Sequence, residues 1–134
     1  MAIVLKVDTQ TNKHIVDITE RIDTILHDCG AQIGLCHIFA MHTTAAVTTA
    51  DLDPGTDLDM LDAFAGMVPK LNYRHPHNPK HVPDHIMSAI IGPGVLVPVS
   101  DGHLLLGTWQ RVILVELDGP RQRNIAVTYI KGDR

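Results

Sequence analysis

Histidines are concentrated in one segment of the chain, Asn72–His85, which reads NYRHPHNPKHVPDH and holds four of the nine histidines. Imidazole binds metals and transfers protons near neutral pH, and loops often carry binding and catalytic residues. Histidines in a proline-rich loop therefore favour a functional site. A solvated surface loop would have the same composition, so the loop by itself leaves both interpretations open.

Pro83 divides this segment into a loop and a helix. Proline is favoured at the first helical position, so we expect a helix to begin there and His85 to project from its first turn. His81 has the four-residue spacing of a helical metal chelate with His85, but it lies outside the expected helix. The positive end of the helix dipole disfavours the charged form of His85 and leaves a neutral nitrogen for a metal. A capping or core role would fit His85 equally well.

A third candidate histidine, His42, ends an expected strand and precedes Thr43 and Thr44. The threonine hydroxyl and amide groups could orient the ring or a ligand beside it, although a buried structural histidine would have the same neighbours. His37 lies an odd number of positions away, so its ring should point to the opposite face of the strand. We therefore do not expect His37 and His42 to share a site.

Charged residues supply further candidates. Asp59 is the carboxylate that we select from the acidic segment of the second expected helix. Glu116 lies in the hydrophobic run VILVEL, where a charge must face solvent or be paired, so it is either outward-facing or a site acid. Arg121 and Arg123 are two positions apart and can face one side of a strand, an arrangement that suits a phosphate or a carboxylate. A solvated hairpin edge is the alternative for the two arginines.

Size and composition restrict the class of protein. A chain of 134 residues with a formal net charge of -4 fits one domain, residues 1–134, with a single core. No cluster of lysine and arginine is present to neutralise phosphates, so we do not expect nucleic-acid binding. No apolar run approaches a membrane span, and the first residues lack a secretory signal pattern. The two cysteines, Cys29 and Cys36, are too few for a disulfide framework, so we expect buried thiols in a cytoplasmic protein.

The elements that must position these residues are short strands and helices. One helix is expected from Thr19 to Gly30, one from Asp53 and Pro54 to near Pro69, and one from Pro83 to Gly92. Strands are expected at Ile3–Val7, His14–Ile18, Gly34–His42, Thr44–Ala50, Val95–Val99, His103–Leu106, Arg111–Leu117 and Asn124–Ile130. Because strands and helices do not alternate regularly, the order predicts an α+β fold with about three helices and a largely antiparallel sheet or two packed sheets.

The motifs together resemble the YjbQ-like family, also called the secondary thiamine-phosphate synthase family. The resemblance covers most of the chain after about Gly30. It rests on HTTAAVTT from His42, on Asp53-Pro54 with Asp59 downstream, on Tyr73 and His75, on HIMSAIIGP from His85, on VPV from Val97, on LGTWQ from Leu106 and on ELDGPRQR from Glu116. The chain departs from the family pattern at Asp51-Leu52, at His103 and in the run His81-Val82-Pro83-Asp84.

The resemblance implies a β-sandwich core, a homotrimer with sites near subunit boundaries, and a zinc site whose ligands would be His42, His75 and His85. Three histidines and an open position are typical of a catalytic zinc site. By motif position, the substrate-binding residues would be Thr43, Thr44, Trp109, Gln110, Arg121 and Arg123. Asp59 or Glu116 would be the general base or would orient a metal ligand.

We therefore expect a metal-dependent enzyme that acts on a small phosphorylated metabolite. The family name implies a weak thiamine-phosphate synthase activity, which joins hydroxymethylpyrimidine diphosphate to thiazole phosphate and releases pyrophosphate. A non-catalytic metabolite-binding or scaffolding trimer and a metal-assisted hydrolase are the alternatives.

Overall fold

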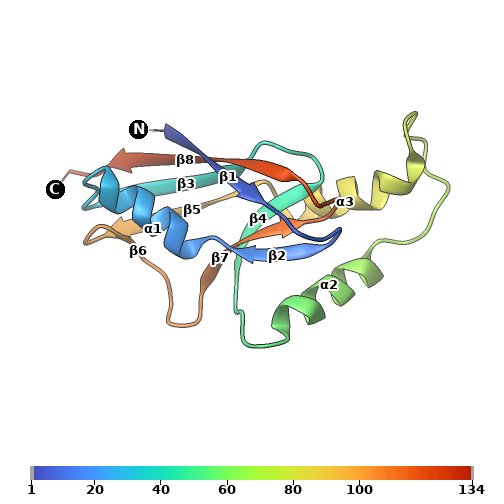
Figure 1. Cartoon of the computed structure of the whole chain (residues 1–134), viewed down its shortest axis with the longest axis horizontal. Coiled ribbons are helices and arrows are strands. Elements are labelled where there is room, and N and C mark those ends of the chain that lie inside the picture. Colours follow the sequence, from blue (N-terminus) through green and yellow to red (C-terminus); the bar gives the residue numbers. More distant parts are fainter. Residues whose placement is uncertain (1, 134) are drawn as a thin grey trace.

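The computed structural model describes residues 2–133, which form two antiparallel sheets and three α-helices (Figure 1). The five-stranded sheet has the order β1-β8-β3-β5-β6 and the three-stranded sheet the order β2-β7-β4. The strands are β1 Ala2–Asp8, β2 His14–Asp17, β3 Gly34–Ala40, β4 Ala45–Ala50, β5 Gly94–Ser100, β6 His103–Leu104, β7 Arg111–Glu116 and β8 Gln122–Lys131. The helices are α1 Thr19–Asp28, α2 Thr56–Met67 and α3 Val82–Ile91, and a 3-10 turn, η1 Pro79–His81, precedes α3.

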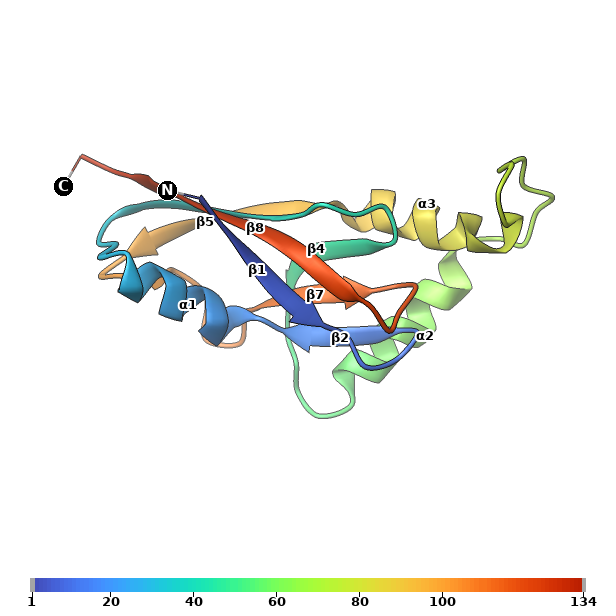
Figure 2. The same ribbon diagram turned by 45° about the horizontal axis from the view of Figure 1, so that its top comes forward.

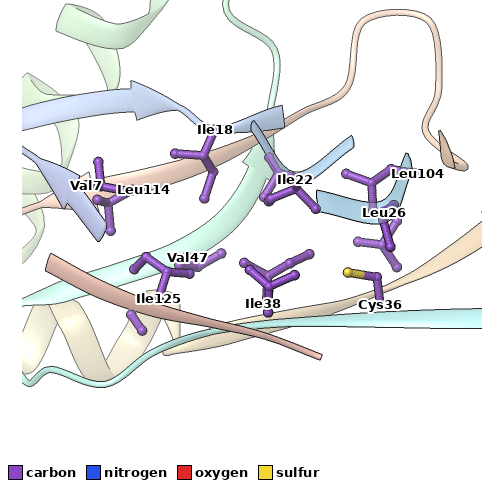
Figure 3. Close-up of a cluster of buried hydrophobic side chains, with 14 of the residues drawn as sticks. Val7, Ile18, Ile22, Leu26, Cys36, Ile38, Val47, Leu104, Leu114 and Ile125 are labelled. Atoms are coloured by element: carbon purple, nitrogen blue, oxygen red, sulfur yellow. The ribbon is translucent and has the colours of Figure 1, made fainter. Parts of the chain in front are cut away.

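The main core lies between the two sheets, with α1 closing one side (Figure 3). Alternate residues of β3 and β8 point inward, and Ile38 and Ile125 are fully buried. Ile22 and Leu26 of α1 enter the same cluster because residues four apart lie on one helix face. The expected α+β fold is confirmed, and the two packed sheets form the sandwich.

A second apolar cluster lies on the opposite face of the three-stranded sheet, where α2 and α3 cover it. Met87 of α3 belongs to this cluster together with Ile113 and Val115 of β7. Strand β7 is thus buried on both faces, and Val112 to Glu116 are all inaccessible. A strand covered on both faces carries apolar residues on both, so β7 has no alternation from which to tell which side Glu116 faces.

The outer face of the five-stranded sheet carries exposed apolar side chains. Phe39 and Leu35 of β3 lie beside Leu96 of β5 and Ile130 of β8 on this face. In Figures 1 and 2, α1 lies on the side of the molecule away from this face, and α2 and α3 lie toward the end opposite the two termini. No helix within residues 2–133 has the length and apolar character needed to cross a membrane.

Several expected boundaries were wrong by one or two residues. The second helix begins at Thr56 rather than at Pro54, because Gly55 adopts a left-handed conformation with φ of 89° and the amide of Thr56 donates to the carbonyl of Asp53. The cap of α1 is also different, since the side chain of Asp17 accepts from the amide of Thr19. Cys36 is buried as expected, whereas Cys29 is exposed at the end of α1.

Candidate functional site

An open pocket of about 500 Å³ lies where the β3–β4 turn, the start of α3 and the β7–β8 turn meet. Most of the side chains that line it are polar or charged. They are Met41, His42, Thr43, Thr44, His77, His81, His85, Asp118, Arg121 and Arg123. The pocket thus brings together two of the three expected metal ligands and four of the six expected substrate-binding residues.

A buried ion pair forms the floor of this region. Arg123 is 3% exposed and Glu116 is fully buried, and the Arg123 Nε atom donates to Glu116 Oε1 at 2.8 Å. The Arg123 Nη2 atom also donates to Glu116 Oε2, and to the carbonyl oxygen and Oγ1 of Thr44 at 3.0 and 2.9 Å. The hydroxyl of Thr9 donates to Glu116 Oε1 at 2.7 Å, and the amide of Asp118 donates to Oε2 at 3.1 Å.

This network determines the charge state of Glu116. Burial by itself would raise the pKa of the carboxyl, but the hydrogen bonds from Arg123 and Thr9 outweigh burial and leave the pKa below its ordinary value. Both carboxylate oxygens are occupied by donors. Glu116 is therefore an ionised partner of Arg123, and its main contact with the pocket is through that arginine and Thr44.

His42 lies two residues beyond the end of β3, and its ring is held by the backbone of β8. The amide of Asn124 donates to His42 Nε2 at 2.7 Å, so the neutral ring carries its proton on Nδ1. Burial lowers the pKa of His42 below its ordinary value, and the positive charge of Arg123 lowers the pKa further against the opposing effect of Glu116. His42 is thus a neutral histidine whose lone pair is already used.

His85 has the same tautomer, but its backbone contact is made by the other ring nitrogen. Its Nδ1 atom lies 3.0 Å from the carbonyl oxygen of Thr43, which can only accept, so Nδ1 carries the proton and Nε2 keeps its lone pair. The His75 ring stacks on His85, with ring centroids 5.2 Å apart and planes inclined by 13°. His75 Nδ1 accepts from the amide of His77 at 3.2 Å.

These tautomers allow a test of the zinc site expected from the resemblance. His85 has the arrangement typical of a metal ligand, with one ring nitrogen bonded to a backbone carbonyl and the other free. His42 and His75 do not fit, because each accepts a backbone N–H through its lone pair in this arrangement. Within residues 2–133, the set of three ligand atoms that all lie within 4.8 Å of one another belongs to His81, Asp84 and Asp118.

That second set was missed by the sequence analysis, which placed His81 in a loop and did not select Asp84 or Asp118. Asp84 is in the first turn of α3 and Asp118 is in the β7–β8 turn, so the two are brought together only by the fold. The run His81-Val82-Pro83-Asp84, where the chain departs from the family pattern, was the one available signal.

Three of the expected site residues lie away from the pocket. Asp59 is exposed in the first turn of α2. Trp109 and Gln110 are exposed in the β6–β7 loop, where Gln110 Nε2 donates to Thr49 Oγ1 at 3.1 Å. Thr49 lies near the end of β4, whereas the pocket residues Met41 to Thr44 precede the start of β4. Within a single chain, the Trp109 loop and the pocket therefore lie at opposite ends of β4.

Comparison with known proteins identifies relatives along nearly the whole chain. The family model described as UPF0047 protein YjbQ-like matches residues 3–132. A UPF0047 protein of Mycobacterium tuberculosis is 39% identical over 135 residues, covering 96% of this chain and 97% of that protein. The UPF0047 protein YugU of Bacillus subtilis is 34% identical over 128 residues, covering 95% of each.

Solved structures agree with this assignment. A YbjQ-like protein of unknown function from Sulfolobus solfataricus superposes with a TM-score of 0.91 at 31% identity, covering 98% of this chain and 97% of that chain. A hypothetical protein from Aeropyrum pernix superposes with a TM-score of 0.88 at 31% identity, covering 98% and 99% of the two chains. The chain therefore belongs to the UPF0047 family of YjbQ-like proteins.

Proposed function

We propose that the chain is an enzyme that binds the phosphate group of a small metabolite in the pocket beside His42 and His85. The observation that carries the proposal is the convergence of four histidines, two arginines and two threonines on one open pocket. The acidic groups there are balanced, since Glu116 pairs with Arg123 and Asp118 Oδ2 pairs with Arg121 Nη2 at 2.9 Å. An anion entering this pocket would meet donors without an unbalanced negative charge.

The two arginines have different parts in this proposal. Arg121 is exposed at the pocket, and Asp118 fixes its guanidinium through the carbonyl oxygen at 2.6 Å and the carboxylate. Arg121 would therefore contact the phosphate directly. Arg123 is committed to Glu116 and Thr44, so it would position the Thr43–Thr44 turn rather than bind substrate.

His85 is the group best placed to move a proton. The Thr43 carbonyl holds its Nδ1–H, so the free Nε2 can accept a proton from a substrate or from water. Glu116 would not act as the base, because its oxygens accept from Arg123, Thr9 and the Asp118 amide. We assign Glu116 a positioning role through Arg123, and the exposed Asp59 stays a prediction of the resemblance.

The zinc site of His42, His75 and His85 also stays a prediction of the resemblance, and we route no step through it. It would require His42 and His75 to exchange their backbone hydrogen bonds for the metal. A thiamine-phosphate synthase reaction likewise stays a proposal. In that reaction the diphosphate of the substrate leaves as pyrophosphate. The arginine and histidines of the pocket suit a diphosphate because they can donate hydrogen bonds to its oxygens.

A homotrimer is proposed on the basis of the exposed apolar face of the five-stranded sheet, which a second copy could cover. Trp109 and Gln110 lie at the far end of β4 in their own chain, so they would reach a pocket only from a neighbouring copy. A cytoplasmic location stays a prediction of the sequence.

Arg121 provides the test of this function. Binding of pyrophosphate to the metal-stripped, untagged protein is measured by calorimetry for the wild type and for Arg121→Ala. We expect at least a tenfold weaker affinity in the variant, because removing a charge-assisted hydrogen bond costs roughly 1.5–3 kcal/mol. Arg21→Ala is the matched control, since Arg21 donates to the carbonyl of Lys6 outside the pocket.

Turnover assays distinguish a transferase, a hydrolase and a non-catalytic binding protein. The wild type and His85→Ala are assayed with hydroxymethylpyrimidine diphosphate and thiazole phosphate, and with a panel of phosphoesters in water. Synthesis that is lost in His85→Ala supports the transferase, and phosphoester hydrolysis that is lost supports the hydrolase. Pyrophosphate binding without any turnover would contradict the enzyme and favour a binding protein. Equal binding by the wild type and Arg121→Ala would overturn the phosphate site.

A further inference from the structure

A second group of potential metal ligands lies beside the histidine pocket, where the start of α3 meets the β7–β8 turn. His81 Nδ1 is 3.4 Å from Asp84 Oδ2 and 3.5 Å from Asp118 Oδ1. One ring nitrogen of His81 and one carboxylate oxygen of each aspartate all lie within 4.8 Å of one another. The two aspartate side chains are 16% and 14% exposed, so both carboxylates are largely withdrawn from water.

His81 Nδ1 makes a long hydrogen bond to Asp84 Oδ2, and both His81 distances also suit a shared cation. A good N–H···O bond has a donor–acceptor distance of roughly 2.7–3.2 Å, and His81 Nδ1 carries at most one proton for two oxygens. Zinc binds nitrogen and oxygen at about 2.0–2.2 Å, which places neighbouring ligands of a tetrahedron about 3.3–3.6 Å apart. The His81 distances of 3.4 and 3.5 Å match this ligand-to-ligand spacing.

The other oxygen of each carboxylate is already held. Lys13 Nζ lies 2.5 Å from Asp84 Oδ1, and Arg121 Nη2 lies 2.9 Å from Asp118 Oδ2. Carboxylates that bind a metal through one oxygen are commonly fixed by hydrogen bonds to the other. Lys13 and Arg121 therefore orient Asp84 Oδ2 and Asp118 Oδ1 toward the same imidazole nitrogen.

A divalent ion bound by this group would keep enough positive charge to attract an anion. Lys13 and Arg121 neutralise the two carboxylates, so a divalent ion would bring its charge into the pocket largely uncompensated. His81 and Asp118 line the same pocket as Arg121 and Arg123, and the fourth ligand position of a tetrahedral ion would be available there. Phosphate binding and metal binding should therefore strengthen each other.

We propose that His81, Asp84 and Asp118 bind a divalent transition-metal ion, separate from the zinc site that the resemblance predicts for His42, His75 and His85. One imidazole and two carboxylates suit zinc, manganese or cobalt rather than calcium, which prefers an all-oxygen shell. The metal part of this proposal does not depend on the pocket's function. Only the expected coupling to phosphate rests on that proposed function.

Metal titration of the untagged, metal-stripped full chain tests the site. The background variant His85→Ala removes the histidine best oriented for the other site. Zinc binding is followed by calorimetry and cobalt binding by its visible absorption, which reports a tetrahedral site of nitrogen and oxygen ligands. We expect about one ion per chain in His85→Ala, and at least tenfold weaker binding when His81→Ala or Asp118→Asn is added.

The controls keep the result specific. His103→Ala removes an exposed histidine whose nearest carboxylate, Asp23, is 3.9 Å away, and it should leave binding within twofold of the background. Circular dichroism of each variant verifies the fold. Loss of all binding in His85→Ala, or equal binding with and without His81 and Asp118, would overturn the proposal.

Phosphate distinguishes this site from the proposed function. If zinc binds through His81 but pyrophosphate binding is absent with and without zinc, the metal site stands and the phosphate function fails. If pyrophosphate binds through Arg121 while His81→Ala has no effect on zinc, the phosphate function stands and the metal site fails.

Discussion

Replacing Glu116 by glutamine should destabilise the protein strongly without changing its shape. The amide keeps the volume of the carboxylate but removes the counter-ion of Arg123, a side chain that is only 3% exposed. Breaking a buried pair by removing one partner costs about 3–5 kcal/mol, because the remaining charge stays buried. Arg123 keeps its hydrogen bonds to the Thr44 carbonyl and hydroxyl oxygens, so we expect the lower end of this range.

The expected loss in the free energy of unfolding corresponds to a measurable decrease in Tm. At about 2.1 cal/mol/K per residue, a chain of 134 residues has an unfolding entropy of about 280 cal/mol/K. A loss of about 3 kcal/mol should therefore lower Tm by about 11 °C. Thermal melts and urea denaturation at pH 7 measure the change in the free energy of unfolding.

The double variant Glu116→Leu with Arg123→Met is the control for the charge argument. Replacing both partners by apolar residues removes the unpaired charge, so this variant should be more stable than Glu116→Leu alone. A destabilisation of Glu116→Gln below about 1 kcal/mol would refute the reasoning, and so would a double variant no more stable than Glu116→Leu.

The pH dependence provides an independent readout. The folded pKa of Glu116 lies below its ordinary value of 4.5, so its stabilisation is fully present above about pH 4.5 and is lost as the pH falls through the folded pKa. Glu116→Gln should lack this part of the acid destabilisation. Because Glu116 raises the pKa of His42, the same variant should also shift the NMR titration of His42 to lower pH.

Three further outcomes test other parts of the structure. His42 has a folded pKa below its ordinary value of 6.5, because it is partly buried beside Arg123, so stability should fall as the pH drops from about 6.5 toward that folded pKa. His42→Gln should lack this loss in urea denaturation, and an unchanged profile would contradict the burial of His42 beside Arg123. Ser88→Ala should cost about 1–2 kcal/mol in the same assay, because the buried hydroxyl donates to the Ala45 carbonyl at 2.7 Å; a loss below about 0.5 kcal/mol would contradict this. Leu96→Asp places a charge on the exposed sheet face and should convert a trimer to monomers by light scattering, whereas an equally trimeric variant would exclude that face as the interface.

The sequence predicted best those elements whose signals are local. Pro83 and Gly92 delimit the third helix, and the structure places both within one residue of its ends. Gly30 likewise ends α1 with a φ of 72°, where its amide donates to His27 and the amide of Ala31 donates to Leu26. These positions are determined by backbone conformation within a few residues, so no tertiary information is needed.

The partners of the charged residues could not be predicted in the same way. Glu116 and Arg123 are joined through the β7–β8 turn across two different sheets, and a strand buried on both faces gives no alternation from which to infer the direction of a side chain. The proximity of His81 and Asp118 is even harder to predict from the sequence. Their distance depends on how α3 packs beside the turn, which no spacing along the chain encodes.

Glu116 and Arg123 are buried against each other, which explains why these two charged residues would not contact a ligand directly. Arg123 holds the carbonyl oxygen and hydroxyl of Thr44, and the carbonyl of the adjacent Thr43 accepts the Nδ1–H of His85. The Glu116–Arg123 pair therefore fixes the turn that selects the tautomer of His85. An ion pair placed beneath a pocket in this way costs desolvation, yet it supplies a rigid acceptor for the histidine that a mobile loop would not. On this argument, Glu116→Gln should increase the rotational freedom of the His85 ring as well as lowering Tm, which side-chain NMR relaxation would reveal.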